Sequence, residues 1–218
     1  MARRERALQP PAATGERLDG FPRRTLRAGT TWFRQHHDRP GGDRGAWFFA
    51  SHALGEDGGG RFDLAVPRGT CYLSSTERGA LNELVGPECA VRGWVDADLL
   101  AGRVVSRLSL PVDVVAANTT SSRAADFRVT TEIATTERYD ITQAWAEALL
   151  GAGFGGVVAL LRFTPGAARM LALFGGAGAP DPGWPGDPDA APARALAEGW
   201  GIEVVDPPAL ADVVIVAP

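Results

Sequence analysis

Short runs of apolar residues, one of them alternating with polar residues, recur along the chain, the pattern of short strands. Residues 103–110 show this alternation most clearly. The runs 70–74, 156–162 and 170–174 are short and mostly apolar, so they are also expected to be strands, and 24–29 is expected to be a short strand. The pattern therefore predicts a sheet of short strands, and the polar stretch at 34–45 is expected to be a loop.

Two segments have the spacing of amphipathic helices instead. The first spans about 140–151, where apolar residues recur every three to four positions and Asp140 with Gln143 forms a capping-box pattern. The second spans about 76–86, and Gly86-Pro87 is expected to end it. Because strands and helices do not alternate regularly, the predicted fold class is α+β rather than a doubly wound sheet.

Composition divides the chain into three parts. Residues 1–20 are rich in Arg, Pro and Ala without apolar periodicity, so they are expected to form a disordered N-terminal arm. Residues 21–176 are expected to form one domain, and 177–218 a Pro/Gly-rich linker followed by a small C-terminal extension. The last segment, 211–217, is apolar enough to pair at a sheet edge or against a partner.

Charge and cysteine content narrow the class of protein. The formal net charge of -4 argues against direct nucleic-acid binding or an anionic membrane surface as the main partner. All 22 basic residues are arginine, and a chain without lysine excludes a Schiff base or a Walker-type phosphate loop. Cys71 and Cys89 have no CxxC spacing and no apolar run approaches 18 residues, so a cytoplasmic protein with reduced thiols is expected.

Two motifs are set aside. Residues 151–156 match GxGxxG, but they close a predicted helix and lead into a strand, whereas a dinucleotide fingerprint follows a strand and opens a helix. A plain helix-to-strand turn is expected there. His36 and His37 have no Cys or carboxylate at metal-ligand spacing, so no metal site is expected.

Four pieces of the chain, in order, resemble the RES domain family, and the likeness covers about 21–176. The first piece is 25–29. The second is 60–63 (GRFD) together with 70–74, and the third is 80–84. The fourth runs from 139–143 through 153–156 to 171–174. The resemblance implies an ADP-ribosyltransferase-like fold of short, mostly antiparallel strands with few helices. It also implies a toxin of a toxin–antitoxin system that depletes cellular NAD and has an Xre-type antitoxin protein as its partner.

The resemblance implies particular roles for particular residues. The family is named after Arg, Glu and Ser; Arg27 and Glu83 match the first two, whereas the expected Ser falls on Leu161, a departure from the family pattern. NAD would be the substrate, with no bound cofactor, and the nicotinamide–ribose bond would be cleaved by water or inorganic phosphate. Glu83 would stabilise the positive ribose carbon, and Arg27, with Arg61, would bind phosphate. Tyr72 would offer the nicotinamide a flat face and a hydroxyl.

Each of these residues also has a purely structural interpretation. Arg27 can be a surface cation and Tyr72 a core residue, and Glu83 lies roughly 130° from the centre of its helix's apolar face, toward solvent or a cleft. Two other functions stay open: a binding module that lost catalysis with its Ser, and an ADP-ribosyltransferase acting on a protein. The NAD-cleaving hypothesis requires Arg27, Tyr72 and Glu83 to converge on one pocket.

Overall fold

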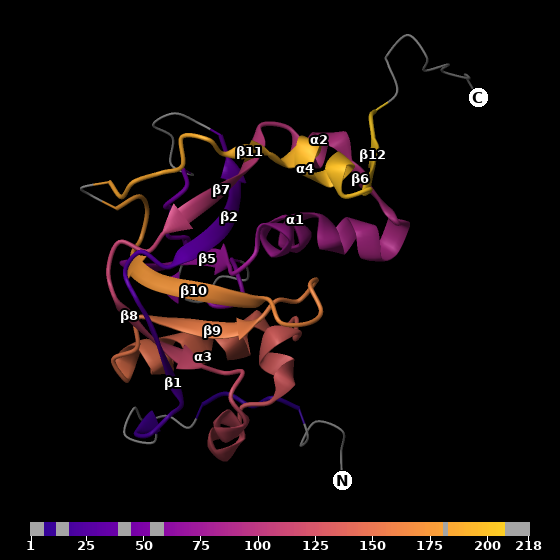
Figure 1. The fold of residues 1–218 in the computed structure, drawn as a ribbon. Helices are drawn as coiled ribbons and strands as arrows, with labels where there is room; N and C mark the ends of the chain where they lie inside the picture. The colour runs from indigo at the N-terminus through magenta and orange to yellow at the C-terminus, as the bar shows by residue number, and fades with distance from the viewer. Residues whose placement is uncertain (1–6, 12–17, 39–44, 53–58, 181–182, 208–218) are drawn as a thin grey trace.

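A computed structural model describes residues 7–11, 18–38, 45–52, 59–180 and 183–207, and its centre is an eight-stranded sheet (Figure 1). All neighbouring strands are antiparallel except β8 and β9, which are parallel. In spatial order the strands are β1 (Arg23–Leu26), β8 (Val114–Asn118), β9 (Gly156–Leu160), β10 (Arg169–Gly176), β5 (Arg68–Ser74), β2 (Thr31–His37), β7 (Arg103–Ser109) and β11 (Ala191–Pro192).

Smaller elements surround this sheet. Two parallel pairs of strands are β3 (Ser51–His52) with β4 (Leu64–Ala65), and β6 (Trp94–Asp96) with β12 (Glu203–Val205). The helices are α1 (Glu77–Arg92), α2 (Ala97–Leu100), α3 (Tyr139–Gly151) and α4 (Ala193–Gly199), with 3-10 turns η3 (Ser122–Phe127) and η4 (Thr131–Ala134). Strands and helices are mixed without regular alternation, so the fold is α+β.

Two helices cover different parts of the sheet (Figure 1). The helix α3 packs its apolar stripe, with Trp145 and Leu149 buried, against β9. The helix α1 packs against β2, and its buried Leu81 and Val85 share a core with α4. This arrangement places α1 over the junction between β2 and β5.

The junction between β2 and β5 has fewer paired residues than the other junctions of the eight-stranded sheet. β5 is paired with β10 along its whole length, and β2 with β7, but β2 and β5 share a single registered pair, Phe33 with Ser74. The two strands therefore diverge beyond this pair, and a cavity can form between them.

The strand β2 corrects the first part of the loop predicted at 34–45, because it continues through His36 to His37; residues 39–44 lie outside the described residues. Its residues do not alternate apolar with polar, since Arg34 and Gln35 line cavities instead of the core. A periodicity analysis detects burial, so it misses a strand whose side chains face a polar cavity.

The helix α1 also differs from its prediction, since it passes through Gly86-Pro87 and ends at Arg92. Pro87 removes the N–H that would bond to the Glu83 carbonyl but does not end the helix, whose buried residues Leu81 and Val85 lie before it. Gly86 has a packing role, because a Cβ there would lie 2.4 Å from the Phe163 side chain. The helix finally stops at Gly93, which has φ of 80°.

The helix α3 begins without the predicted capping box. Asp140 pairs with Arg138, and the Gln143 side chain donates to the Gly60 carbonyl oxygen at 3.0 Å. Tertiary contacts therefore take up both side chains that a local cap would use. The glycines at 151–156 are a helix-to-strand turn between α3 and β9, as predicted.

The described part of the predicted disordered arm is packed on the domain instead. Leu8 is only 2% exposed and Leu18 is also buried in the core under α3. The Trp145 indole donates to the Gln9 carbonyl oxygen at 2.9 Å. Two isolated leucines in a polar stretch give no periodic signal, so only the tertiary structure reveals that they are buried.

Truncating Leu8 tests this packing. We expect Leu8→Ala to lower the free energy of unfolding by about 2–4 kcal/mol, because a buried leucine is replaced by a cavity. Chemical denaturation measures the change. The exposed Gln9 is the matched control, and Gln9→Ala should change stability little. If both substitutions lowered the free energy of unfolding equally little, the packing of Leu8 would be contradicted and the prediction of a disordered arm supported.

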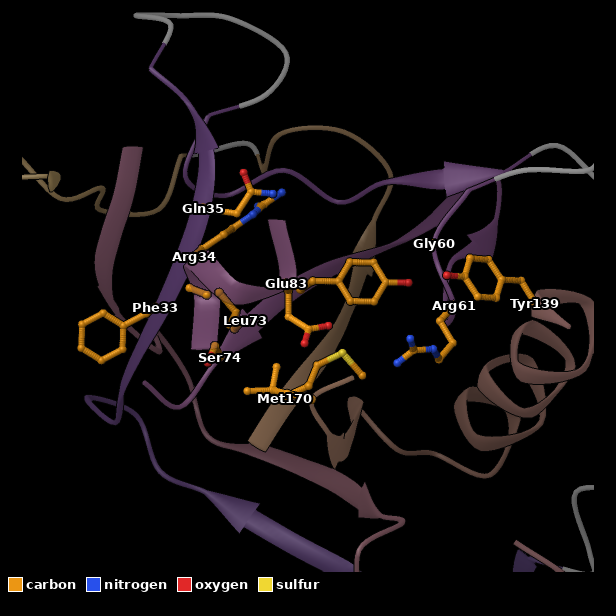
Figure 2. Close-up of a pocket in the computed structure, with 13 residues that line it drawn as sticks. Phe33, Arg34, Gln35, Gly60, Arg61, Leu73, Ser74, Glu83, Tyr139 and Met170 are labelled. Atoms are coloured by element: carbon orange, nitrogen blue, oxygen red, sulfur yellow. The ribbon is translucent and has the colours of Figure 1, made fainter. Parts of the chain in front are cut away.

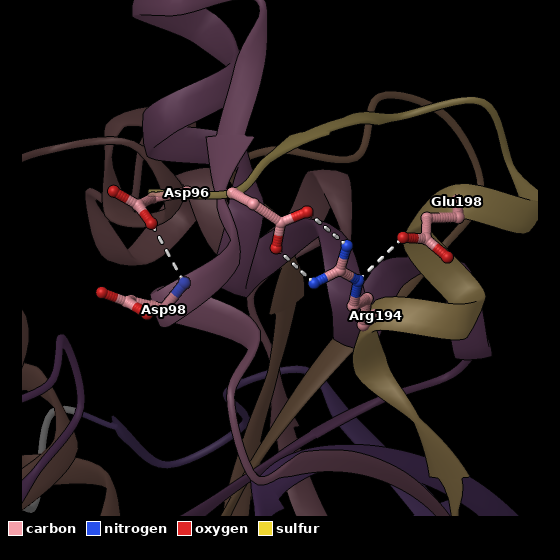
Figure 3. Close-up of polar contacts among 5 residues, drawn as sticks. Asp96, Asp98, Arg194 and Glu198 are labelled. Atoms are coloured by element: carbon pink, nitrogen blue, oxygen red, sulfur yellow. Dashed lines mark hydrogen bonds and ion pairs between the residues drawn. The ribbon is translucent and has the colours of Figure 1, made fainter. Parts of the chain in front are cut away.

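The C-terminal extension is integrated into the domain as far as the structure describes it. The strand β11 pairs with β7, and β12 pairs with β6. Arg194 on α4 binds both Asp206 oxygens and Glu198, which fixes the chain after β12 (Figure 3). The apolar segment at 211–217, predicted to pair at a sheet edge, lies outside the described residues. No helix in the described ranges combines the length and apolar character needed to cross a membrane.

Candidate functional site

A cavity of about 270 Å³ lies where β2 and β5 diverge. The strands supply its back wall, α1 supplies one side, and the loop before β4 together with the start of α3 supplies the other (Figure 2). The residues that line it are Phe33, Arg34, Gln35, Gly60, Arg61, Tyr72, Leu73, Ser74, Ala80, Glu83, Tyr139, Leu161 and Met170. Three of the four predicted site residues, Arg61, Tyr72 and Glu83, are therefore brought together.

Glu83 points into this cavity from α1, toward the space that Arg61 faces from the other side (Figure 2). Its Oε1 accepts a hydrogen bond from the Phe163 backbone N–H at 2.8 Å, which fixes the carboxylate. Burial raises the pKa of Glu83, and the Phe163 bond and the charges of Arg61 and Arg162 offset part of the rise. The result is a half-buried carboxylate that faces a cavity rather than solvent.

Arg61 is the most unusual polar residue of the site. It is 7% exposed, its Nε has no hydrogen-bond partner, and no carboxylate of the described residues forms an ion pair with it. The guanidinium lies 5.9 Å from the centre of the Tyr139 ring, an additional but weak attraction. A buried guanidinium without an anion is costly, so this site is suited to a ligand that supplies one.

The first turns of α3 hold Arg61 in place from behind. The Thr142 hydroxyl donates to the Arg61 carbonyl oxygen, and Gln143 donates to the neighbouring carbonyl of Gly60. Two segments of the family resemblance, 60–63 and 139–143, thus meet in space. The polar side chains of α3 position the backbone that carries the arginine.

Tyr72 contributes its ring to the cavity, but its hydroxyl is already used. The hydroxyl donates to Asp63 Oδ1 at 2.8 Å and accepts from the Phe62 N–H at 2.7 Å. Burial, then the charge of Asp63, raises the pKa of Tyr72 well above its ordinary value. Gly60 must lack a side chain here, because a Cβ would lie 2.6 Å from the Tyr72 hydroxyl. The Tyr72 hydroxyl is therefore not free for the predicted polar contact to a ligand, although Tyr72 does line the cavity.

Arg27 is the predicted site residue that the structure does not bring to the cavity. Its side chain is 76% exposed and pairs with Asp113 at 2.7 Å. It lies in the turn between β1 and β2 and is not among the residues that line the cavity. The required convergence of Arg27 with Tyr72 and Glu83 therefore does not occur.

Arg34 on β2 lines the cavity in its place, and sequence reasoning missed it. Its Nη1 donates to the Ala46 carbonyl oxygen and to Cys71 Sγ, both at 2.9 Å, so neither partner neutralises its charge. The sequence does contain a signal for Arg34. The apolar pair Trp32-Phe33 precedes it and indicates a strand no less clearly than the residues before Arg27 do.

Leu161 lines the cavity where the family Ser was expected, and it is 6% exposed. A hydroxyl nearby comes from another strand: Ser74 at the end of β5 donates to the Thr76 carbonyl oxygen at 2.8 Å. Gly79 allows Ser74 and Leu161 to pack together, since a Cβ there would lie within 3 Å of both side chains. Ser74 was not singled out from the sequence, because a strand-terminal serine is common.

The histidines lie apart from this cavity. The His36 ring contacts Ser106 Oγ at 2.7 Å and the His37 carbonyl oxygen at 2.9 Å. Within the described ranges, no three His, Cys, Asp or Glu side chains are grouped as metal ligands would be.

The geometry defines the chemistry that the site can support. A fixed carboxylate and an unpaired guanidinium face one cavity, with an aromatic ring on its wall. Such a site can bind an anionic group at one side and stabilise positive charge developing at the other.

Comparisons with known proteins identify the family and the fold. A family model described as RES domain matches residues 31–185, a range that includes Arg34 and begins after Arg27. Among solved structures, a chain of the crystal structure of the M. tuberculosis MbcT–MbcA toxin–antitoxin complex is similar in fold. The TM-score is 0.52 at 14% sequence identity, over 73% of this chain and 81% of that chain. No curated protein matches the sequence. The similarity agrees with the predicted α+β class, and this prediction is confirmed.

Proposed function

The chain belongs to the RES domain family, and from this premise we propose that it cleaves the nicotinamide–ribose bond of NAD as the toxin of a toxin–antitoxin pair. The proposed enzyme is an NAD glycohydrolase or phosphorylase that depletes NAD in the cytoplasm. The observation that carries the proposal is the Glu83 carboxylate facing the unpaired Arg61 guanidinium across one cavity.

The proposed step breaks the bond between the nicotinamide nitrogen and the ribose carbon. The electron pair leaves with nicotinamide, which becomes neutral, and the ribose carbon becomes positive. Glu83 stabilises this charge or orients the ribose hydroxyls. Water then adds to the carbon and loses a proton, giving ADP-ribose, or inorganic phosphate adds and gives the ribose phosphate ester.

The arginines would hold the anionic part of NAD. Arg61 takes the role first expected of Arg27, because it is buried at the cavity and forms no ion pair with a carboxylate of the described residues. Arg34 is the second candidate, since it lines the same cavity and its contacts are neutral. Guanidinium groups suit pyrophosphate because they can donate two parallel hydrogen bonds.

A protein partner is part of this proposal. The structurally similar chain comes from a toxin–antitoxin complex, which supports an antitoxin partner for this chain. An Xre-type antitoxin is the class that the family resemblance implies. Such a partner would silence the enzyme by covering the cavity between β2 and α1.

Leu161 favours a second candidate function, a binding module that retains NAD but does not cleave it. The residue is apolar and lines the cavity where the family supplies a hydroxyl. Incubation of the purified protein with NAD separates the two candidates. We expect nicotinamide to appear together with ADP-ribose, or with its phosphate ester when phosphate is the acceptor. NAD that binds in calorimetry but stays intact would support the binding module.

The pH profile of nicotinamide release tests the role of Glu83 without any mutation. The proposed step needs the carboxylate form, and burial raises the pKa of Glu83. The rate should therefore fall on acidification at a pH above the pKa of an exposed glutamate, which is about 4.3. A rate that stays constant down to that value would mean that the ionised form of Glu83 is not required.

A further inference from the structure

The Glu83 carboxylate is held by the segment that joins β9 to β10. Its Oε1 accepts the backbone N–H of Phe163, which lies 80 residues further along the chain, at 2.8 Å. The helix α1 holds this residue less firmly than an uninterrupted helix would, because Pro87 lacks the N–H that would bond to the Glu83 carbonyl oxygen. The position of the carboxylate in the cavity therefore depends on where Phe163 lies.

Gly86 determines how closely Phe163 can approach α1. It follows Glu83 by three residues, so the two lie on the same side of the helix. A Cβ at Gly86 would lie 2.4 Å from both Cβ and Cγ of Phe163, closer than carbon atoms can pack. The backbone does not require glycine here, since Gly86 is not among the glycines with positive φ. An interior glycine lowers helix stability relative to alanine, so what it provides at this position is space.

Phe163 also has contacts outside α1. The Arg162 guanidinium lies 5.2 Å from the centre of the Phe163 ring, and it pairs with Glu137 at 2.8 Å. The side chain of Phe163 is thus packed on Gly86 and beside an ion pair, while its backbone N–H is directed at Glu83.

We propose that the packing of Phe163 on Gly86 positions the Glu83 carboxylate for the cleavage of NAD, so that Gly86 and Phe163 are positioning residues. This inference rests on the proposed function for the reaction that Glu83 serves, but the placement of the carboxylate does not require that NAD be cleaved. A displacement of about 1 Å at a reacting group can lower a rate about a hundredfold.

Gly86→Ala tests the contact, because the added Cβ must displace Phe163 and the N–H that it carries. We expect kcat for nicotinamide release to fall roughly tenfold. KM should change little, because the substitution leaves Arg61 in place at the cavity.

The pH profile of Gly86→Ala should also differ from that of the parent. The Phe163 N–H is the strongest of the groups that lower the pKa of Glu83, so its displacement raises that pKa and the rate should fall at a higher pH on acidification. Gly86→Ala replaces none of the other charged or titratable groups around Glu83, which are Arg34, Arg61, Tyr72, Tyr139 and Arg162.

Val85→Ala is the matched control. Val85 is buried in the core that α1 shares with α4 and does not line the cavity, so its truncation destabilises the same helix without adding an atom beside Phe163. Its kcat and pH profile should equal those of the parent. Phe163→Gly keeps the N–H but removes the side chain that packs on Gly86. It should lower kcat and shift the pH profile as Gly86→Ala does, and it decides the question if Gly86→Ala does not fold.

An NMR titration of the isotope-labelled full chain separates this inference from the proposed function, because it needs no substrate. The pKa of Glu83 should be higher in Gly86→Ala than in the parent, and Glu83→Gln identifies the signal. This difference in a parent that releases no nicotinamide would reject the proposed reaction and leave the positioning contact standing. The inference is overturned if Gly86→Ala and Phe163→Gly leave the Glu83 pKa unchanged, or if Val85→Ala raises it equally.

Discussion

Glu83→Gln abolishes nicotinamide release from NAD, with an expected loss of roughly three orders of magnitude in rate. The amide keeps the shape of the side chain and can still accept the Phe163 N–H through its oxygen. What it lacks is the negative charge that faces the developing positive ribose carbon. A chromatographic assay of nicotinamide release measures the loss.

The same substitution should not weaken the fold. Burial raises the pKa of Glu83, so above that pKa the ionised carboxylate lowers the free energy of unfolding relative to a neutral side chain. Glu83→Gln should therefore be at least as stable as the parent at pH 8, and any gain should vanish at acidic pH where Glu83 is protonated. Thermal denaturation at the two pH values measures this difference.

Glu88→Gln on the same helix is the control, because Glu88 pairs with Arg92 outside the cavity. It should retain the parent rate. Full turnover in Glu83→Gln would show that another group stabilises the reacting carbon, and an unfolded variant would show that the carboxylate is needed for the fold.

Arg61→Met is expected to weaken NAD binding by about two orders of magnitude, since a buried charged hydrogen-bond donor to the substrate is lost. Methionine is long and apolar, and it can fill the space of the arginine stem beside Tyr139. Because the Arg61 Nε has no partner, its removal should not lower the free energy of unfolding. Calorimetric binding and chemical denaturation together measure both effects.

Arg68→Met provides the comparison, because Arg68 is exposed on β5 and does not line the cavity. It should bind NAD like the parent. If Arg61→Met unfolds the protein, the arginine has a structural role. If the variant folds and binds NAD normally, the anion site must lie elsewhere.

Much of the fold follows from local sequence. The strands β5, β7, β9 and β10 and the helix α3 have short apolar runs or clear periodicity, and each forms where it was predicted. Burial of apolar side chains is the dominant stabilising term, and its period reveals the element that achieves it. The α+β class follows from the irregular order of these elements along the chain.

The candidate site was only partly predictable. Arg61, Tyr72 and Glu83 were identified because they lie in segments that resemble a known family, and the structure brings them to one cavity. Arg27 was identified because 25–29 resembles the family's opening strand, and Arg34 was missed because 34–45 was predicted to be a loop. Only the assembled sheet shows that Arg34 lines the cavity and Arg27 does not.

The sequence by itself determined the identity of most elements and the residue types available for chemistry. The tertiary structure decided which polar groups face a cavity, that Leu8 is buried, and that the Tyr72 hydroxyl is occupied by Asp63. The physical reason is that periodicity reports burial within one element. The partner of a buried polar group comes from another element, and only the assembled fold supplies it.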